Sequence, residues 1–468
     1  MAKDKETKFF HLIDSFEGDK VIWMIVLLLM MISIVTVFTS TPLLALQQKT
    51  TRFDIIKGHL MIVGLGLAVI IILYNIKSIK FFKFFSQFGF ILSLLMLVFL
   101  VLHIGADPND PSGGWPVRAA KVNDSWRIIK VFSLQIHVYE VVKVAMVMYL
   151  AWAVNAMKDD DETRKGTGDF ALLRWIQGLF PKAEKLKSPF VEKSFYLYFP
   201  ILVTSALMLD GGTSATLLFL MMMFLILFVG GVDMKEIIAL GSVAAVLLGL
   251  SIAFGLSERF KHVNLDTRTG SLSAKLEKVM AAQPSDRRAV IDDMKLEQPV
   301  GAMLAIKEGG PLGKWIGNSN QKYKVAVIFE DYIFSFIIEE TGWWGAILIM
   351  LLYLSLLARG RMLVLICDNY FAKSAMAGLV VLISLQAFMH MAINVHLLPQ
   401  TGQTLPMISH GASSFLCFCV AFGVILSISR MAHRDTLKEA RSAGPYNGNG
   451  DDVRSGLNDL DHLDREDI

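Results

Sequence analysis

Glu140 and Lys143 lie three positions apart in the apolar stretch LQIHVYEVVKVAMVMYLA. At helical spacing the two side chains share one face, where the carboxylate and the ammonium can neutralise each other. Charged residues inside long apolar segments are costly and commonly mark functional sites. The pair is therefore compatible with two roles, a self-compensating contact that supports packing and a charged element of a site.

Asp331 follows Glu330 in VIFEDYIFSFIIEETGWWG, where a long apolar segment begins. An aspartate in this position can cap a helix start, and the helix dipole would keep its carboxylate ionised. An ionised carboxylate at a membrane–water boundary could equally take a proton from a substrate hydroxyl. Glu339 and Glu340 lie further along the same segment, where a surface role explains them less well.

Two turn motifs also precede apolar segments. In NVHLLPQTGQTLPMISHGASSFLCF, Pro399, Gly402 and Pro406 predict a tight re-entrant turn. The serines that would open the following helix are Ser409, Ser413 and Ser414. Exposed amides at a helix start favour anions such as phosphate, although a plain capped helix explains the pattern as well. Asp210, in MLDGGTSATLL, shows ordinary turn chemistry, which favours a structural role.

The elements that must position these residues are long apolar helices. Hydrophobic residues make up 54% of the chain and charged residues only 19%, below the fraction that is usual in soluble domains. Because lipid offers the backbone no water to bond, we predict an all-α integral membrane protein with about ten transmembrane helices. The predicted spans are 21–43, 57–76, 84–104, 134–156, 192–209, 211–231, 233–255, 332–358, 372–396 and 410–431.

The distribution of Lys and Arg predicts the orientation of these spans. Both residue types are concentrated in 158–187, at the N-terminus and in the C-terminal tail. The positive-inside rule then places both termini in the cytoplasm. The segments expected to face outward are 105–130, 256–331 and 397–409. The chain thus divides into a cytoplasmic N-terminus (1–20), a membrane domain (21–432) whose large external loop is 256–331, and an acidic cytoplasmic tail (433–468) expected to be disordered.

Several classes of site are not indicated by the sequence. Cys367, Cys417 and Cys419 lie within or beside apolar segments and imply no disulfide framework. The net charge of +3 gives no reason to expect a nucleic-acid partner. The sequence has no phosphate-binding glycine loop and no Cys/His metal spacing. Any chemistry must come from the membrane bundle and its external loops, where 271–296 has helical spacing of apolar residues.

The segments described above occur in the order and spacing of the motifs of the SEDS family (shape, elongation, division and sporulation). The resemblance extends over residues 20–432. The family's E-x-x-K resembles 140–143, and its G-N-S-x-Q-K loop is matched by 317–322. Its D-F-I-F…E-E-x-G resembles 331–342, and its L-P-x-x-G-x-T-L-P-x-x-S-Y-G-G-S-S resembles 398–414. The last two motifs are highly specific.

The sequence also departs from the family pattern. The turn P-D-L-G-T-A has its counterpart in 209–214, but residues 137–139 stand where the family has Q-P-S. His410 replaces a tyrosine, Ala412 replaces a glycine, and the insertion 271–296 lengthens the external loop. None of these changes removes an acid or a base. The T-L-P of the last motif and the G-N-S-x-Q-K loop resemble the division member of the family more than the elongation member.

The resemblance implies a peptidoglycan glycosyltransferase that polymerises lipid II during septal wall synthesis. Asp331 would be the catalytic base for the acceptor hydroxyl. The resemblance and the need for positive charge at the pyrophosphate leaving group point to Arg127, Lys143 and Lys322. Glu140 and Glu340 would orient Lys143 or line the cavity. The remaining substrate-binding candidates are Gln321, of the loop motif, and, as lesser ones, Ser409, Ser413 and Ser414.

Cofactor, partners and location are expected on the same ground. A divalent cation such as Mg²⁺ or Mn²⁺ would suit the charge of the diphosphate, although no motif requires one. Besides lipid II and membrane lipids, the expected partners are a class B penicillin-binding protein and other division proteins. The penicillin-binding protein is a transpeptidase that would dock on the external loop 256–330 and the outer ends of spans eight and nine. No nucleic acid is expected. The location implied is the bacterial inner (plasma) membrane, as a multi-pass protein at the division septum.

Three other functions fit parts of the sequence. A lipid II flippase or another transporter would also need many spans with buried charges, but its site is expected near the middle of the membrane. A non-catalytic scaffold for the transpeptidase would tolerate replacement of Asp331. An elongation paralogue would carry out the same chemistry in cell-shape maintenance, along the side wall of the cell.

Overall fold

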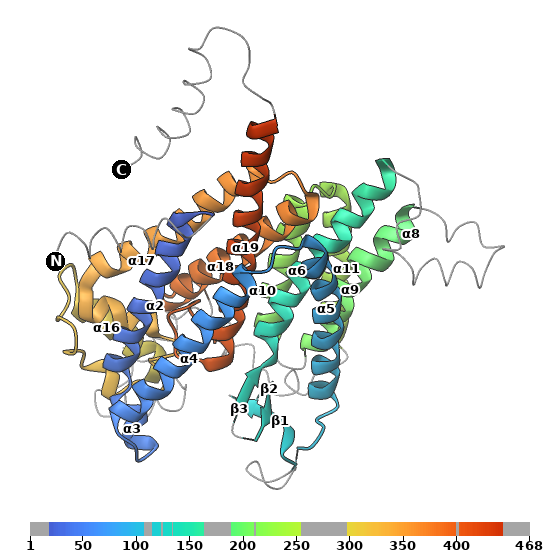
Figure 1. Cartoon of the computed structure of the whole chain (residues 1–468). Helices are drawn as coiled ribbons and strands as arrows, with labels where there is room; N and C mark the ends of the chain where they lie inside the picture. Colours follow the sequence, from blue (N-terminus) through green and yellow to red (C-terminus); the bar gives the residue numbers. More distant parts are fainter. Residues whose placement is uncertain are drawn as a thin grey trace.

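Long helices dominate the computed structural model, which describes residues 18–106, 115–122, 125–132, 134–162, 189–209, 212–253, 297–398 and 402–442 (Figure 1). The first half of the chain contributes α2 (Lys20–Ser40), α3 (Pro42–Gln47), α4 (Arg52–Tyr74), α5 (Ile79–Val101) and α6 (Val138–Glu162). Next come α8 (Pro189–Lys193), the π-helical η3 (Ser194–Tyr198), α9 (Phe199–Met208), α10 (Thr213–Val229) and α11 (Met234–Ala253). The last part holds α16 (Glu297–Gly309), the 3-10 turn η5 (Gln321–Tyr323), α17 (Ile333–Ile366), α18 (Tyr370–Asn394) and α19 (Ala412–Ser442).

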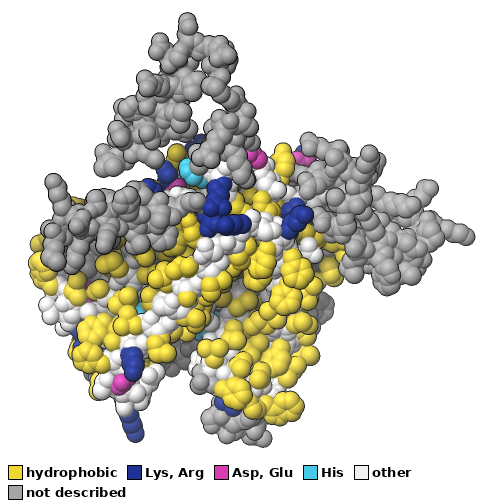
Figure 2. All heavy atoms as spheres, in the orientation of Figure 1, with side chains coloured by type: hydrophobic (Ala, Val, Ile, Leu, Met, Phe, Trp, Pro, Cys, Tyr) yellow, Lys and Arg dark blue, Asp and Glu magenta, His cyan; other side chains and the backbone are white. Residues whose placement is uncertain are grey.

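Seven of the described helices are long and apolar enough to cross a membrane, namely α2, α4, α5, α6, α17, α18 and α19. Hydrophobic side chains cover a broad band of the visible face, and Lys and Arg gather along its upper edge (Figure 2). Local chemistry starts these helices where apolar runs begin; for example, the Asp19 side chain accepts a hydrogen bond from Ile22 N at 2.9 Å. The prediction of a helical membrane protein is confirmed, whereas the count of ten spans and their orientation stay predictions.

A small antiparallel sheet precedes α6, and the sequence did not predict it. Its strands are β1 (Val117–Val122), β2 (Ser125–Val131) and β3 (Leu134–His137), in the order β1-β2-β3. In the register of the second ladder, Ile128 pairs with His137. The sheet lies at one end of the bundle, below α5 and α6 (Figure 1). The expected start of a span at residue 134 was therefore wrong, because strand pairing occupies the segment before α6 begins at Val138.

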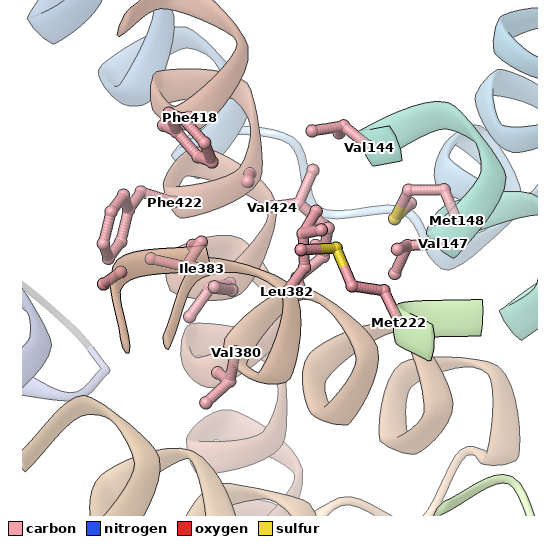
Figure 3. Packing of buried hydrophobic residues seen from close by; sticks show 14 of the residues in the cluster. Val144, Val147, Met148, Met222, Val380, Leu382, Ile383, Phe418, Phe422 and Val424 are labelled. Atoms are coloured by element: carbon pink, nitrogen blue, oxygen red, sulfur yellow. The ribbon is translucent and has the colours of Figure 1, made fainter. Parts of the chain in front are cut away.

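The apolar core lies where α6, α10, α18 and α19 meet. Figure 3 shows side chains from these helices pointing toward one another, among them Val147 of α6, Met222 of α10, Leu382 of α18 and Val424 of α19. Helix α18 contacts α6, α10, α17 and α19. Because it touches all four, any polar side chain that α18 buries must find its partners on a neighbouring helix or turn.

Helix α17 is broken near its start, at Gly342, where φ is 69° and ψ is −162°. The left-handed φ favours glycine. A Cβ at this position would lie 2.4 Å from the Pro311 carbonyl oxygen and 2.6 Å from Gly313 N, so the link after α16 passes directly against the break. α17 also runs to Ile366, beyond the predicted end of its span.

The segment between α18 and α19 dips into the bundle, as its proline and glycine pattern predicts. Its described part is 402–411, in which Leu405, Met407 and Ile408 are buried. Ser33 Oγ of α2 donates to the Ile408 carbonyl at 3.1 Å, and Tyr353 Oη of α17 donates to the Pro406 carbonyl at 2.5 Å. We call this segment the re-entrant turn.

The C-terminal helix differs from the prediction, and some predictions cannot be compared with the structure. α19 continues through Ser442, so the stretch that follows residue 432 begins as helix and not as disordered tail. The predicted helix at 271–296, the turn at Asp210, Pro399 and the tail after residue 442 lie outside the described residues.

Candidate functional site

Asp331, at the start of α17, lies next to Arg127 of β2 and Gly402 of the re-entrant turn. A Cβ on Gly402 would be 3.3 Å from Arg127 Nη1 and 3.5 Å from Asp331 Oδ2. The two charged groups are thus no further apart than the sum of these distances. Gly402 also has φ +63°, which glycine adopts without strain. The re-entrant turn therefore passes Asp331 and Arg127 at a glycine. Because Gly402 has no side chain, the space between the carboxylate and the guanidinium stays open.

The capping alternative for Asp331 does not hold. Helix α17 begins at Ile333, and its N-cap residue is Tyr332. Asp331 instead ends the turn before the helix, with its amide donating to the Val327 carbonyl at 3.1 Å. Its half-buried side chain thus has a different task from closing the helix end.

The adjacent carboxyl groups of Glu330 and Asp331 differ in acidity. Burial raises the pKa of Asp331 to about 6, and the nearby Arg127 charge opposes this rise. Burial and the neighbouring Asp331 raise the pKa of Glu330 to about 8. At neutral pH Asp331 is therefore ionised while Glu330 keeps its proton. A carboxylate with a pKa near the working pH is suited to accept a proton from a hydroxyl group.

Glu140 and Lys143 form the predicted ion pair, within a larger group that we call the central cluster: Glu140, Lys143, Gln386 and Gln403. Lys143 Nζ donates to Glu140 Oε1 at 2.8 Å, to Gln386 Oε1 at 2.6 Å and to Gln403 Oε1 at 3.0 Å. These acceptors use all three donors of an ammonium group. Lys143 is 4% exposed. The pair therefore fastens α6 to α18 and to the re-entrant turn.

The loop before α17 and the first turns of that helix form a second polar group, the loop cluster: Lys314, Ser319, Glu339 and Glu340. Glu339 accepts from Ser319 Oγ at 2.5 Å, from the Asn320 amide at 2.8 Å and from Lys314 Nζ at 3.0 Å. Glu340 accepts from the Gly317 amide at 2.9 Å. The two glutamates that a surface role explained poorly thus supply acceptors to a loop that is not helical.

Gln321 and Lys322, two of the predicted substrate ligands, belong to this loop and are buried. Lys322 Nζ donates to the Gly317 carbonyl, and Gln321 Nε2 donates to Glu308 Oε1 at 3.4 Å. Glu340, which binds the Gly317 amide, lies about 10 Å along α17 from Ile333, the residue at which the helix begins after Asp331 and Tyr332. Of the two glutamates predicted to orient Lys143, Glu140 contacts it. The hydrogen bonds of Gln321, Lys322 and Glu340 instead hold these three residues in the loop before α17.

The three predicted serines hold the turn and the sheet in place. Ser409 Oγ donates to the Glu330 carbonyl at 2.9 Å and accepts from the Leu405 amide at 2.8 Å. Ser413 Oγ accepts from the His137 amide at 3.0 Å, which joins β3 to α19. Ser414 Oγ and Thr404 Oγ1 are 2.7 Å apart. Their hydroxyl groups are thus engaged within the protein, that of Ser409 next to Asp331, and any role as phosphate ligands stays a prediction.

Three residues of the site could not be singled out from the sequence. They are Gln386, His390 and Asn394 of α18, which connect the central cluster with the backbone at Asp331. Their signal was present as polar residues every fourth position of an apolar helix. Trp126, before Arg127, stacks on His103 with ring centroids 4.2 Å apart.

The described residues do not bring enough ligand side chains together to hold a metal ion by themselves. In that part, His, Cys, Asp and Glu side chains nowhere gather in threes around a common point. Glu330 and Asp331 bring two adjacent carboxyl groups to the site, fewer than three donors of this kind. The described donors therefore do not build a metal site by themselves, and a divalent cation stays a prediction from the charge of the diphosphate.

Fold and site together define a polytopic helical membrane protein whose ionised carboxylate and arginine meet beside a re-entrant turn. More narrowly, the chain belongs to the FTSW_RODA_SPOVE family, described as "Cell cycle protein", which matches residues 19–434. This confirms the SEDS resemblance of the sequence.

Individual relatives agree with this assignment. A protein of Caulobacter vibrioides named "Probable peptidoglycan glycosyltransferase FtsW" is 28% identical over 261 residues, 56% of this chain and 60% of the relative. A protein of the same name from Geobacter metallireducens is 27% identical over 316 residues, 66% of this chain and 71% of the relative. Stage V sporulation protein E of Bacillus subtilis is 34% identical over 134 residues, 28% of this chain and 37% of the relative.

Solved structures share the fold. One chain of a peptidoglycan synthase complex that coordinates polymerization and crosslinking matches with a TM-score of 0.56 and 19% identity, covering 89% of this chain and 98% of that one. The rod shape determining protein RodA of Thermus thermophilus matches with a TM-score of 0.52 and 18% identity, covering 90% of this chain and 98% of RodA. At such identities the likeness establishes the arrangement of helices.

Proposed function

We propose that the protein is a peptidoglycan glycosyltransferase that polymerises lipid II into glycan strands in septal wall synthesis. The observation that carries this proposal is the Asp331 carboxylate beside the Arg127 guanidinium, with Gly402 between them. The relatives named FtsW support it, although the Caulobacter match spans only 60% of that relative's length.

The reaction joins two sugars and releases a diphosphate. Asp331 takes the proton of the acceptor GlcNAc 4-hydroxyl, whose oxygen forms a bond to the anomeric carbon of the donor MurNAc. The bond from that carbon to the diphosphate oxygen breaks, and its electron pair leaves with undecaprenyl diphosphate. Arg127 lies where its fixed positive charge can stabilise the leaving group or hold the headgroup.

Lys143 is less well placed for this task than the sequence suggested. Its ammonium group donates to three side chains and is nearly fully buried. A diphosphate could bind it only by displacing one of these acceptors. We therefore assign the leaving group to Arg127 and the fixing of the turn to Lys143.

The wider setting is proposed on the same basis. A multi-pass membrane protein of this family would meet the lipid-linked substrate within the plasma membrane, and the division septum is the expected place. A class B penicillin-binding protein is the proposed partner, because the structurally similar chain comes from a complex that coordinates polymerization and crosslinking.

The proposal is tested with purified full-length protein, its cognate transpeptidase and lipid II. Asp331→Asn is expected to reduce the rate of polymerisation by about 10²- to 10⁴-fold, the usual contribution of a general base. Asp368→Asn is the matched control, since Asp368 is an exposed carboxylate in the short link between α17 and α18. Normal polymerisation by Asp331→Asn would overturn the assignment. Translocation of the headgroup in liposomes without glycan product would favour the flippase, and a side-wall location in cells would favour the elongation paralogue.

A further inference from the structure

Helix α18 carries a line of buried polar side chains, which we call the polar stripe: Gln386, His390 and Asn394. They are spaced four residues apart and so lie on one face of the helix. Each is 1% exposed or less. Burying polar groups is costly unless they are hydrogen-bonded, so each must have partners from other elements. Those partners turn out to be parts of the candidate site.

Gln386 joins the stripe to the central cluster. Its Oε1 accepts from Lys143 Nζ at 2.6 Å, and its Nε2 donates to Glu140 Oε2 at 3.3 Å and to the Thr404 carbonyl at 3.2 Å. The cation and the carboxylate together fix which way the amide points. This end of the stripe therefore holds α6 and the re-entrant turn at once.

His390 occupies the middle of the stripe, and its hydrogen-bond partners determine which ring nitrogen carries the hydrogen. Nδ1 is 2.7 Å from the Gln403 carbonyl oxygen, which can only accept, so Nδ1 carries the hydrogen. Nε2 is then the acceptor, and it faces Asn394 Nδ2 at 3.2 Å. The imidazole is thus a neutral bridge that links the turn to the next residue of the stripe.

Asn394 ends the stripe at the start of α17. Its Nδ2 donates to the Asp331 carbonyl at 3.0 Å. Its Oδ1 accepts from the Ser335 amide at 3.1 Å and from Ser335 Oγ at 2.9 Å. Ser335 N belongs to the first turn of α17, whose amides have no partner within the helix. Asn394 therefore caps α17 from a neighbouring helix and fixes the backbone of Asp331.

We propose that the polar stripe is a positioning device for the site, and that Asn394 is its positioning residue for Asp331. The stripe fixes the position of the Asp331 backbone relative to the central cluster. It fixes the re-entrant turn, which includes Gly402, relative to the same cluster. None of its contacts reaches a reacting atom, so its effect on the rate passes through the geometry of Asp331. The inference about rate rests on the proposed function; the inference about position does not.

The kinetic test compares variants of one helix. Asn394→Leu removes every polar contact of the side chain at similar size, whereas Asn394→Asp keeps an acceptor for Ser335 N and loses the amide donor to Asp331. Ser384→Ala is the control, because Ser384 is buried in α18 and bonds the Tyr353 carbonyl, outside the stripe. With lipid II and the partner, Asn394→Leu is expected to lower kcat by about 100-fold with KM changed little, as for a displaced catalytic group. The kcat of Asn394→Asp is expected to lie between that of Asn394→Leu and that of Ser384→Ala.

The positional test needs no activity. Hydrogen–deuterium exchange of the intact protein in nanodiscs is expected to accelerate over 331–337 in Asn394→Leu, less in Asn394→Asp and not in Ser384→Ala. Unchanged exchange in Asn394→Leu, or an unchanged kcat in an active preparation, overturns the proposal. If the wild type makes no polymer and exchange still accelerates selectively, the proposed function fails and the positioning contact stands. Uniform acceleration along the whole chain would mean general destabilisation and would also overturn it.

Discussion

The central cluster and the loop cluster both bury glutamate and lysine, yet they hold different kinds of structure. Within the part of the chain that the structure describes, the partners of Lys143 Nζ are side chains, from its own helix α6, from α18 and from the re-entrant turn. Glu339 accepts from the backbone amide of Asn320 as well as from Ser319 and Lys314. The first arrangement locks helices to one another, and the second supplies acceptors to amides of an irregular loop, those of Gly317 and Asn320. The same residue types thus serve the site in one place and its scaffold in the other.

The largest difference should appear when one charge of the central cluster is removed. Lys143→Met leaves Glu140 buried without its counter-charge, which we expect to cost about 3–5 kcal/mol of stability and to abolish polymerisation. Thermal unfolding in detergent and the lipid II assay measure both. The double variant Glu140→Gln/Lys143→Met should recover much of the stability, since no unpaired charge remains. A single variant as stable as the wild type would contradict the locking role.

In the loop cluster, Glu339→Gln should affect stability more than chemistry. It keeps the acceptor oxygen but weakens the bonds from charged and amide donors, at a cost of about 1.5–3 kcal/mol. The kcat of the folded fraction should stay close to that of the wild type, because the loop carries no reacting group. A loss of kcat as large as that in Lys143→Met would show that both clusters belong to the site.

The pH dependence of polymerisation should separate the clusters further. Asp331 must be ionised to act as a base, so kcat/KM should fall as the pH drops through about 6, the pKa that burial gives this group. Arg127→Met removes the charge that opposes this rise and should move the acidic limb upward by about one pH unit. Glu339→Gln should leave the limb where it is. An acidic limb that Arg127→Met does not move would argue against the contact across Gly402.

The smallest expected effect concerns one hydroxyl group of the loop cluster. Ser319→Ala removes a donor to Glu339 and an acceptor for the Lys322 amide, which should cost about 1 kcal/mol. Ser242→Ala is the control, because Ser242 is exposed and bonds only within α11. A change in melting temperature equal to that of the control would mean that the loop is held without Ser319.

Long apolar blocks made the helices readable from the sequence, because hydropathy depends on composition and not on partners. The sheet was missed because 117–137 mixes charged and β-branched residues, and its pairing depends on a register that hydropathy does not record. Asp331 and the pair Glu140–Lys143 could be singled out as charges in apolar surroundings. That Arg127 and Gly402 would meet Asp331 depended on the packing of β2 and the turn against α17.

The polar stripe shows what could not be predicted from the sequence. Gln386, His390 and Asn394 were visible as polar residues on one face of an apolar helix. Their partners belong to α6, the turn and α17, which lie far apart in the sequence. A single chain gives the spacing of such residues but not what stands opposite them, so their joint action became clear only from the fold.

The break at Gly342 divides α17 into two helical parts. Residues 333–340 before it are buried, whereas Trp343 and Trp344, directly after it, are exposed. In a continuous helix, one inserted residue would rotate everything beyond it by about 100°. Here the nonhelical Gly342, packed against Pro311 and Gly313, interrupts that coupling. The membrane-facing surface of α17 can therefore change its pattern during evolution without turning Asp331 away from Arg127.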